Sequence, residues 1–161
     1  MAGERKLTLR PIGRVVEGRS GPDQDGGQEQ DTAEIELDDA WSEALDGIEG
    51  FSHIWVLWWL DRFEEPPSAL CVHPEQKPEM PLVGLFATRS PHRPNPIAMT
   101  ATRLLERKGA RLRVEGLDAY TGTPILDIKP YLRRGDQIPD AVMPEWLEQL
   151  WHIHDVEQGT L

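Results

Sequence analysis

The stretch "FSHIWVLWWLDR", residues 51–62, decides the fold. Every residue from Ile54 to Leu60 is apolar, and this run of seven is rich in aromatic and β-branched side chains. A helix that spans a membrane needs about 20 apolar residues, so we expect no membrane span here. A short apolar run of this composition favours a strand that is covered on both faces. We therefore predict that it forms the core strand of a sheet.

Further strand patterns lie on both sides of this segment. Ala33, Ile35 and Leu37 alternate with glutamates, and Lys108–Gly109 makes the turn of a hairpin. Besides the core strand, we predict strands at Leu7–Val16, 33–37, 82–88, 97–105, 110–117 and 124–132. Short helices are expected after Asp38 or Asp39 and at the C-terminus from Pro144. No helical pattern separates the strands between 82 and 132, so the sequence predicts a mainly β sandwich or barrel with helices at its margins.

Two segments have the composition of long loops. "SGPDQDGGQEQD" (20–31) is rich in Gly, Asp and Gln, and the segment 63–81 contains five prolines. The length of 161 residues fits one domain, and we expect a single domain over 1–161. The one cysteine, Cys71, cannot form an internal disulfide, and the first residues have no apolar segment typical of a secretory signal. We expect a cytoplasmic protein.

Charge is divided unevenly along the chain. The formal net charge is -11, and residues 17–50 hold twelve acidic residues against one arginine. Residues 89–134 hold ten basic and four acidic residues. The overall acidity argues against nucleic acid, whose binding depends on Lys and Arg, but the basic half leaves an anionic partner open.

The segment "TRSPHRPNPIAMT" (88–100) combines three prolines with several hydrogen-bond donors. Each proline fixes its own φ and restricts the residue before it, so this loop is stiff. A stiff loop has little conformational entropy to lose on binding, so Arg89, Arg93 and Asn95 are preorganised donors for a polar or anionic ligand. The alternative is a rigid turn whose arginines pair with the acidic segment.

A second polar segment, "DAYTGTPILDIKPY" (118–131), joins a turn to a strand. Gly122 allows close approach of a ligand to the backbone, and the flanking threonines add hydroxyl groups. Asp127 and Lys129 alternate along the strand and therefore share one face. A plain β-turn followed by a structural ion pair is the alternative interpretation.

The two segments together resemble a known family. "GLFATRSPHRPNPIAM" (84–99) and "TGTPILDIKPY" (121–131) are similar to the paired signature of TrmO-like proteins, also called the TsaA or YaeB domain. "GIEGFSHIWVLWWL" (47–60) resembles another strand of that family. The resemblance implies a single small β-barrel that forms a homodimer and binds S-adenosylmethionine. It also implies methylation of N6 of N6-threonylcarbamoyladenosine beside the tRNA anticodon.

The resemblance also assigns roles to residues. It places the cofactor on Asp61, Arg62, Arg89, Met99, Thr121, Gly122, Thr123 and Pro124. For the substrate pocket, it suggests Arg93, Asn95, Asp127, Lys129 and Tyr131. Neither the residues nor the resemblance assigns a general base, although Asp118 could accept a proton or cap a turn. No spacing typical of metal ligands is present, and we expect no metal.

The chain departs from the family pattern at two places. The family's Pro-Arg-Gln or Pro-Lys-Gln segment in the N-terminal loop is absent, with Gln24 or Gln28 as the only remnant. Thr121 stands where the family has Asp. Together with the acidity, these departures leave open a methyltransferase for a small-molecule acceptor. The absence of an assignable base leaves open a module that binds S-adenosylmethionine without catalysis.

Overall fold

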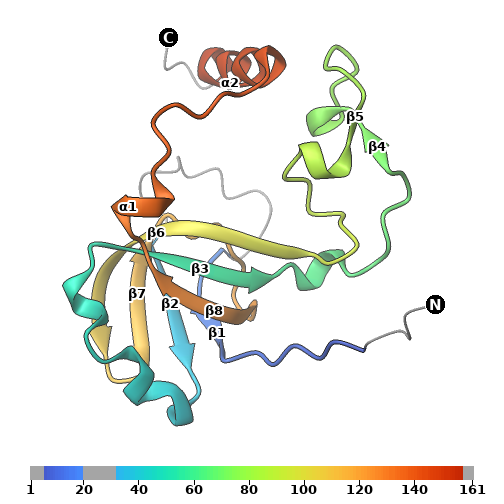
Figure 1. The fold of residues 1–161 in the computed structure, drawn as a ribbon. Coiled ribbons are helices and arrows are strands. Elements are labelled where there is room, and N and C mark those ends of the chain that lie inside the picture. Colours follow the sequence, from blue (N-terminus) through green and yellow to red (C-terminus); the bar gives the residue numbers. More distant parts are fainter. Residues whose placement is uncertain (1–5, 20–31, 158–161) are drawn as a thin grey trace. The chain divides into compact units, whose positions relative to one another are not determined.

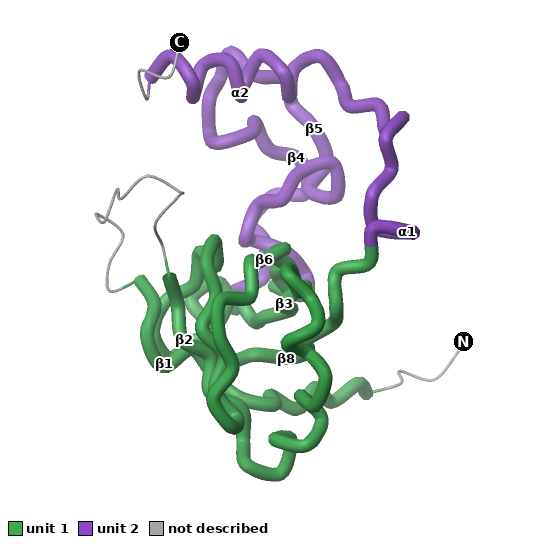
Figure 2. Tube along the Cα trace, turned by 90° about the vertical axis from the view of Figure 1, so that its left-hand side faces the viewer, with its two compact units in different colours: residues 1–64, 95–132 green, residues 65–94, 133–161 purple. Residues whose placement is uncertain are grey.

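The computed structural model describes residues 6–19 and 32–157, so the predicted loop 20–31 lies outside the described residues. The chain divides into two compact units (Figure 2). Unit 1 comprises Met1–Glu64 and Asn95–Leu132, and unit 2 comprises Glu65–Pro94 and Arg133–Leu161. The expectation of one domain over 1–161 stays a prediction.

Unit 1 is built on a closed barrel, which confirms the mainly β prediction (Figure 1). In the described residues its strands follow the order β1-β2-β7-β6-β3-β8, and each neighbouring pair is antiparallel. The strands are β1 (Gly13–Glu17), β2 (Thr32–Leu37), β3 (His53–Trp59), β6 (Ile97–Lys108), β7 (Arg111–Glu115) and β8 (Pro124–Pro130). Closure through the β1–β8 pair leaves this sheet without a free edge.

The apolar stretch forms β3, which pairs with β6 on one side and β8 on the other. Ile54, Val56 and Trp58 are buried in the core cluster. The alternate residues Trp55 and Leu57 are only partly buried. The prediction of a central strand is confirmed, but full burial holds for one face alone, because the interior of a barrel accepts every second side chain.

Two other predicted strands are shorter or different. The strand expected from Leu7 begins only at Gly13, after Pro11, whose ring removes a donor from the ladder. Residues 82–88 form β5 (Val83–Gly84) and then a 3-10 turn at Leu85–Ala87. β5 pairs with β4 (Cys71–Val72), so the proline-rich segment 63–81 contains a short strand of unit 2.

The helices are short except at the C-terminus. The helix expected after Asp38 is a 3-10 helix, and Asp38 forms no side-chain cap. Besides Leu85–Ala87, the 3-10 segments of the described residues are Asp39–Leu45, Ile48–Gly50, Asp61–Phe63 and Pro74–Gln76, and the α-helices are α1 (Arg133–Asp136) and α2 (Glu145–Glu157). α2 confirms the predicted C-terminal helix. None of the described helices is both long and apolar enough to cross a bilayer.

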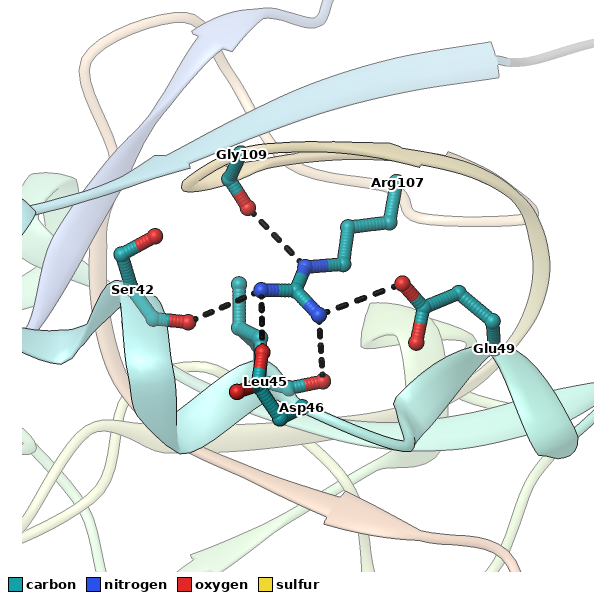
Figure 3. Close-up of polar contacts among 6 residues, drawn as sticks. All are labelled: Ser42, Leu45, Asp46, Glu49, Arg107 and Gly109. Carbon is teal, nitrogen blue, oxygen red and sulfur yellow. Dashed lines mark hydrogen bonds and ion pairs between the residues drawn. The ribbon is translucent and has the colours of Figure 1, made fainter.

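Arg107, near the end of β6, fastens the segment 39–50 to the β6–β7 hairpin (Figure 3). Its guanidinium donates to the carbonyl oxygens of Ser42 (3.0 Å), Leu45 (3.1 Å) and Gly109 (3.0 Å). It also donates to the carboxylates of Asp46 (2.8 Å) and Glu49 (3.1 Å). These carboxylates, Asp46 first, raise the pKa of Arg107. An arginine side chain has five N–H donors, so this network uses all of them.

Candidate functional site

Most of the predicted cofactor residues in unit 1 lie at one end of the barrel. Asp61 and Arg62 follow the end of β3, and Thr121–Pro124 leads into the start of β8. These two strands are antiparallel, with Trp58 opposite Ile125. The end of one strand therefore meets the start of the other, and the two segments come together although about 60 residues separate them in the chain.

A direct contact joins these segments. The guanidinium carbon of Arg62 lies 3.7 Å from the centroid of the Tyr120 ring. A cation over an aromatic face is attracted by about 0.5–1 kcal/mol at an exposed site. Asp61 and Arg62 are both exposed. The contact therefore holds a positive charge beside the 118–124 loop while leaving it accessible to an anionic group.

The end of β1 holds the other side of the same loop. The Gly122 N–H donates to Val15 O (2.8 Å), and the Thr121 N–H donates to Arg19 O (3.2 Å). In return the Gly18 N–H donates to Thr121 Oγ1 (3.1 Å). The Arg19 guanidinium forms an ion pair with Asp118. The loop is thus fixed on the barrel before any ligand binds.

Gly18 is a residue of this site that the sequence does not reveal. A Cβ at Gly18 would lie 2.5 Å from Ala119 O and 2.8 Å from Val15 Cγ1, so only glycine allows β1 to approach the loop this closely. Arg19 and Tyr120 belong to the same arrangement. Arg19 contacts Asp118, 99 residues away, and Tyr120 contacts Arg62 in the 3-10 segment after β3, so no local spacing signals these contacts.

The hydrogen bonds of the loop limit how it can hold a ligand. The N–H groups of Thr121, Gly122 and Thr123 all bond to other residues of unit 1. Gly122 has φ +94 and a Cβ there would meet nothing within 4 Å, so its backbone faces open space. The Thr123 side chain is buried. A ligand would therefore meet the exposed groups of this loop through oxygen atoms and side chains rather than through its N–H groups.

The predicted substrate residues of β8 share the outer face of the barrel with Met99. Leu57 of β3 pairs with Met99 on one side and with Asp127 on the other. Met99 is 50% exposed. Asp127 Oδ2 lies 2.7 Å from Lys129 Nζ, which confirms that these two residues share a face.

The ion pair and the rings next to it define the chemistry of this face. The hydrogen bond to Asp127, with its negative charge, raises the pKa of the Lys129 ammonium. Lys129 is therefore held in its charged form at neutral pH and is a poor proton acceptor. The Tyr131 ring lies 5.8 Å from the ring of Trp55, centroid to centroid. The outer face thus offers the Lys129–Asp127 ion pair and aromatic surface.

The remaining predicted residues come from the stiff loop. Arg89 is exposed and belongs to unit 2, as does Arg93. Arg93 Nη1 donates to the carbonyl oxygens of Thr88 (2.8 Å) and Leu85 (3.3 Å), so its guanidinium also holds its own loop together. Asn95 is exposed and belongs to unit 1. The binding roles of these three residues stay predictions.

The groups at the barrel end fit S-adenosylmethionine by their chemistry. An exposed arginine suits the carboxylate of the methionine part, and the carboxylate of Asp61 suits its ammonium group. Met99 and the neighbouring Ile97, which is 41% exposed, give apolar surface for the adenine. Asp118 is a poor candidate for a base, because its carboxylate is already engaged in the ion pair with Arg19. Within residues 6–19 and 32–157, no cluster of His, Cys, Asp and Glu is arranged to hold a metal.

Unit 1 is a small closed antiparallel barrel, and one end of it carries a fixed polar loop and charges of both signs. These features are typical of a ligand-binding barrel protein. The model of the family "tRNA-methyltransferase O N-terminal domain" matches residues 15–137. The chain belongs to this family. The match includes every predicted cofactor and substrate residue.

Individual relatives agree with this assignment. A "Probable S-adenosyl-L-methionine-binding protein" of Archaeoglobus fulgidus is 45% identical over 74% of this chain and 31% of its own length. The "tRNA (adenine(37)-N6)-methyltransferase" of Escherichia coli is 38% identical over 62% of this chain and 44% of its own length. A crystal structure titled TrmO from Pseudomonas aeruginosa superimposes with a TM-score of 0.64 at 32% identity, covering 86% of this chain and 62% of that one. The chain thus spans only part of these three relatives.

Proposed function

We propose that this chain binds S-adenosylmethionine at the barrel end and transfers its methyl group to N6 of an adenosine beside the anticodon of tRNA. The observation that carries the proposal is the family match over residues 15–137, which covers the assembled segments at Arg62 and Thr121–Pro124. N6-threonylcarbamoyladenosine is the acceptor that the family resemblance suggests. Relatives named as S-adenosylmethionine-binding proteins and as a tRNA methyltransferase support the two halves of the proposal.

Each group at the barrel end has a defined task in this proposal. Arg62 binds the carboxylate of the methionine part, and the loop Thr121–Pro124 positions the nucleoside. Bound S-adenosylmethionine supplies an electrophilic methyl group on a positively charged sulfur. Arg89 of unit 2 is kept as a further proposed ligand of the carboxylate.

The acceptor nitrogen has to be placed in line with the carbon–sulfur bond. When the new nitrogen–carbon bond forms, that bond breaks and the nitrogen loses one proton. The protein contributes mainly by positioning the two reactants, which can lower a barrier by roughly 7–11 kcal/mol. Lys129 remains charged and Asp118 is paired with Arg19, so we assign no protein base and let water accept the proton.

The acceptor is placed on the outer face that carries Asp127, Lys129 and Tyr131. The Lys129 ammonium, which is paired with Asp127, has further N–H donors for a phosphate or for the carboxylate of the threonylcarbamoyl group, and Tyr131 provides aromatic surface for a base. Arg93 and Asn95 are kept as proposed substrate residues. The family resemblance further suggests a homodimer, and the sequence suggests a cytoplasmic location; sedimentation and cell fractionation would test them.

The test is methyl transfer from labelled S-adenosylmethionine to defined RNAs. Two synthetic anticodon stem-loops are compared, one with N6-threonylcarbamoyladenosine and one with unmodified adenosine. We expect label in the modified stem-loop, with activity that falls steeply as salt rises. Failure to label any RNA while the folded protein binds S-adenosylmethionine would refute the tRNA part. Activity on a small acceptor that is insensitive to salt would favour the small-molecule alternative.

A further inference from the structure

Phe86 lies two residues before the stiff loop 88–100, and 81% of its surface is accessible. It lies in the 3-10 turn Leu85–Ala87 of unit 2, directly beside the buried Leu85. The Leu85 N–H donates to Leu70 O (2.9 Å), and Thr88 Oγ1 donates to Leu85 O (2.8 Å). The ring is therefore held outward by an ordered turn and is not part of the hydrophobic core.

One side of the ring has a fixed cation. The guanidinium carbon of Arg93 lies 5.6 Å from the centroid of the Phe86 ring. Arg93 cannot swing away freely, because its Nη1 donates to the carbonyl oxygens of Thr88 (2.8 Å) and Leu85 (3.3 Å). Because these acceptors are uncharged carbonyl groups, they do not neutralise the positive charge of Arg93. The pair presents a flat ring backed by a cation, with most of the ring open to solvent.

The charge around this pair favours an anionic partner. From Met80 to Pro94, the part of unit 2 that contains this pair, the sequence has two arginines and no Asp or Glu, in a chain whose formal net charge is -11. Arg89, three residues from Phe86, is exposed. An open aromatic ring beside positive charge is the combination that binds unpaired nucleotides, with the base on the ring and the phosphate near the cation. The exposed Leu70 and Leu82 of the same unit would suit a protein partner instead.

We infer that Phe86, backed by Arg93, is a stacking platform for an unpaired base of the RNA substrate. This inference rests on the proposed function and adds a contact outside the transfer site. Arg93 then acts as a positioning residue that fixes the ring. The contact is with the face of a base and not its edge, so it tolerates any base at that position.

The experiment measures binding of a fluorescent anticodon stem-loop by anisotropy over a series of salt concentrations. Wild type is compared with Phe86→Leu, which keeps the apolar character of the side chain, and with Phe86→Tyr, which keeps an aromatic ring. Leu82→Ala is the matched control at a second exposed apolar residue. Calorimetry with S-adenosylmethionine and circular dichroism are run on every variant, so that loss of the cofactor site or of the fold is recognised separately.

We expect Phe86→Leu to bind RNA about tenfold more weakly at every salt concentration, with Phe86→Tyr and Leu82→Ala close to wild type. The slope of affinity against salt should stay unchanged in Phe86→Leu, because stacking releases no counterions.

Three results would overturn the platform. Phe86→Leu could bind as wild type does, Leu82→Ala could weaken binding equally, or Phe86→Leu could alter only the sedimentation coefficient, which would indicate a protein interface. Normal methylation of tRNA by Phe86→Leu, with unchanged KM and RNA affinity, would remove this inference and leave the proposed function standing. A wild type that neither binds nor methylates RNA would remove both.

Discussion

The approach of β1 to the 118–124 loop makes Gly18→Ala the sharpest test of how the barrel end is built. A Cβ at this position would lie 2.5 Å from Ala119 O. A carbon–oxygen contact is normally about 3.3 Å or longer, so the two segments must separate by roughly 0.8 Å. That shift would stretch the bonds from the Arg19 N–H to Ala119 O (3.0 Å) and from the Gly18 N–H to Thr121 Oγ1 (3.1 Å).

The expected loss of stability follows from these contacts. Two hydrogen bonds at about 1 kcal/mol each give about 2 kcal/mol. Replacing glycine also restricts the unfolded chain, which returns about 0.4–1 kcal/mol. We therefore expect the free energy of unfolding to fall by about 1–2 kcal/mol in urea titrations, with weaker binding of S-adenosylmethionine. Gly50→Ala is the control, because a Cβ there meets nothing within 4 Å and it should not destabilise the protein. If Gly18→Ala matched Gly50→Ala in both stability and cofactor affinity, the proposed role of this close approach would be refuted.

Three further changes test other parts of the structure. Arg107→Lys should lower the urea midpoint, because three donors on one nitrogen cannot replace five on a planar group; an unchanged midpoint would contradict the network. Asp127→Asn should bring the pKa of Lys129, measured by NMR, down towards 10.5. In the wild type, the stability that this ion pair contributes is present at lower pH and should be lost only as the pH rises through the raised pKa of Lys129. Leu112→Ala, at a fully buried position, should cost about 2–5 kcal/mol in the same urea titration, and a loss below 1 kcal/mol would argue against the core described.

Local patterns were sufficient for several barrel strands and insufficient for the closure of the barrel. The alternation of Ala33, Ile35 and Leu37 and the Lys108–Gly109 turn correctly predicted β2 and the β6–β7 hairpin, because both depend on neighbouring residues. The pairing of β1 with β8 joins residues more than 100 positions apart. No period or turn signal encodes such a pairing, so the strand patterns left a sandwich and a barrel open, and only the family resemblance favoured the barrel.

The same limit applies to the site. Thr121–Pro124 and the stiff loop stand out because glycine and proline mark unusual backbone, and their family motif is long. Gly18 and Arg107 lack such a signal. Gly18 resembles any loop glycine until the loop that it approaches is known, and Arg107 resembles an ordinary solvated strand residue until its partners 58 to 65 positions away are in place.

The central claim, that the barrel end around Arg62 binds S-adenosylmethionine, is tested most directly by calorimetric titration of the cofactor into wild type, Arg62→Ala and Arg113→Ala. Arg113 is an exposed arginine of β7 and serves as the control for loss of one positive charge. We predict saturable binding by wild type and Arg113→Ala and at least about tenfold weaker binding by Arg62→Ala, since a hydrogen bond to a charged group contributes roughly 1.5–3 kcal/mol. No binding by the folded wild type, or equal affinities for the two variants, would contradict the account.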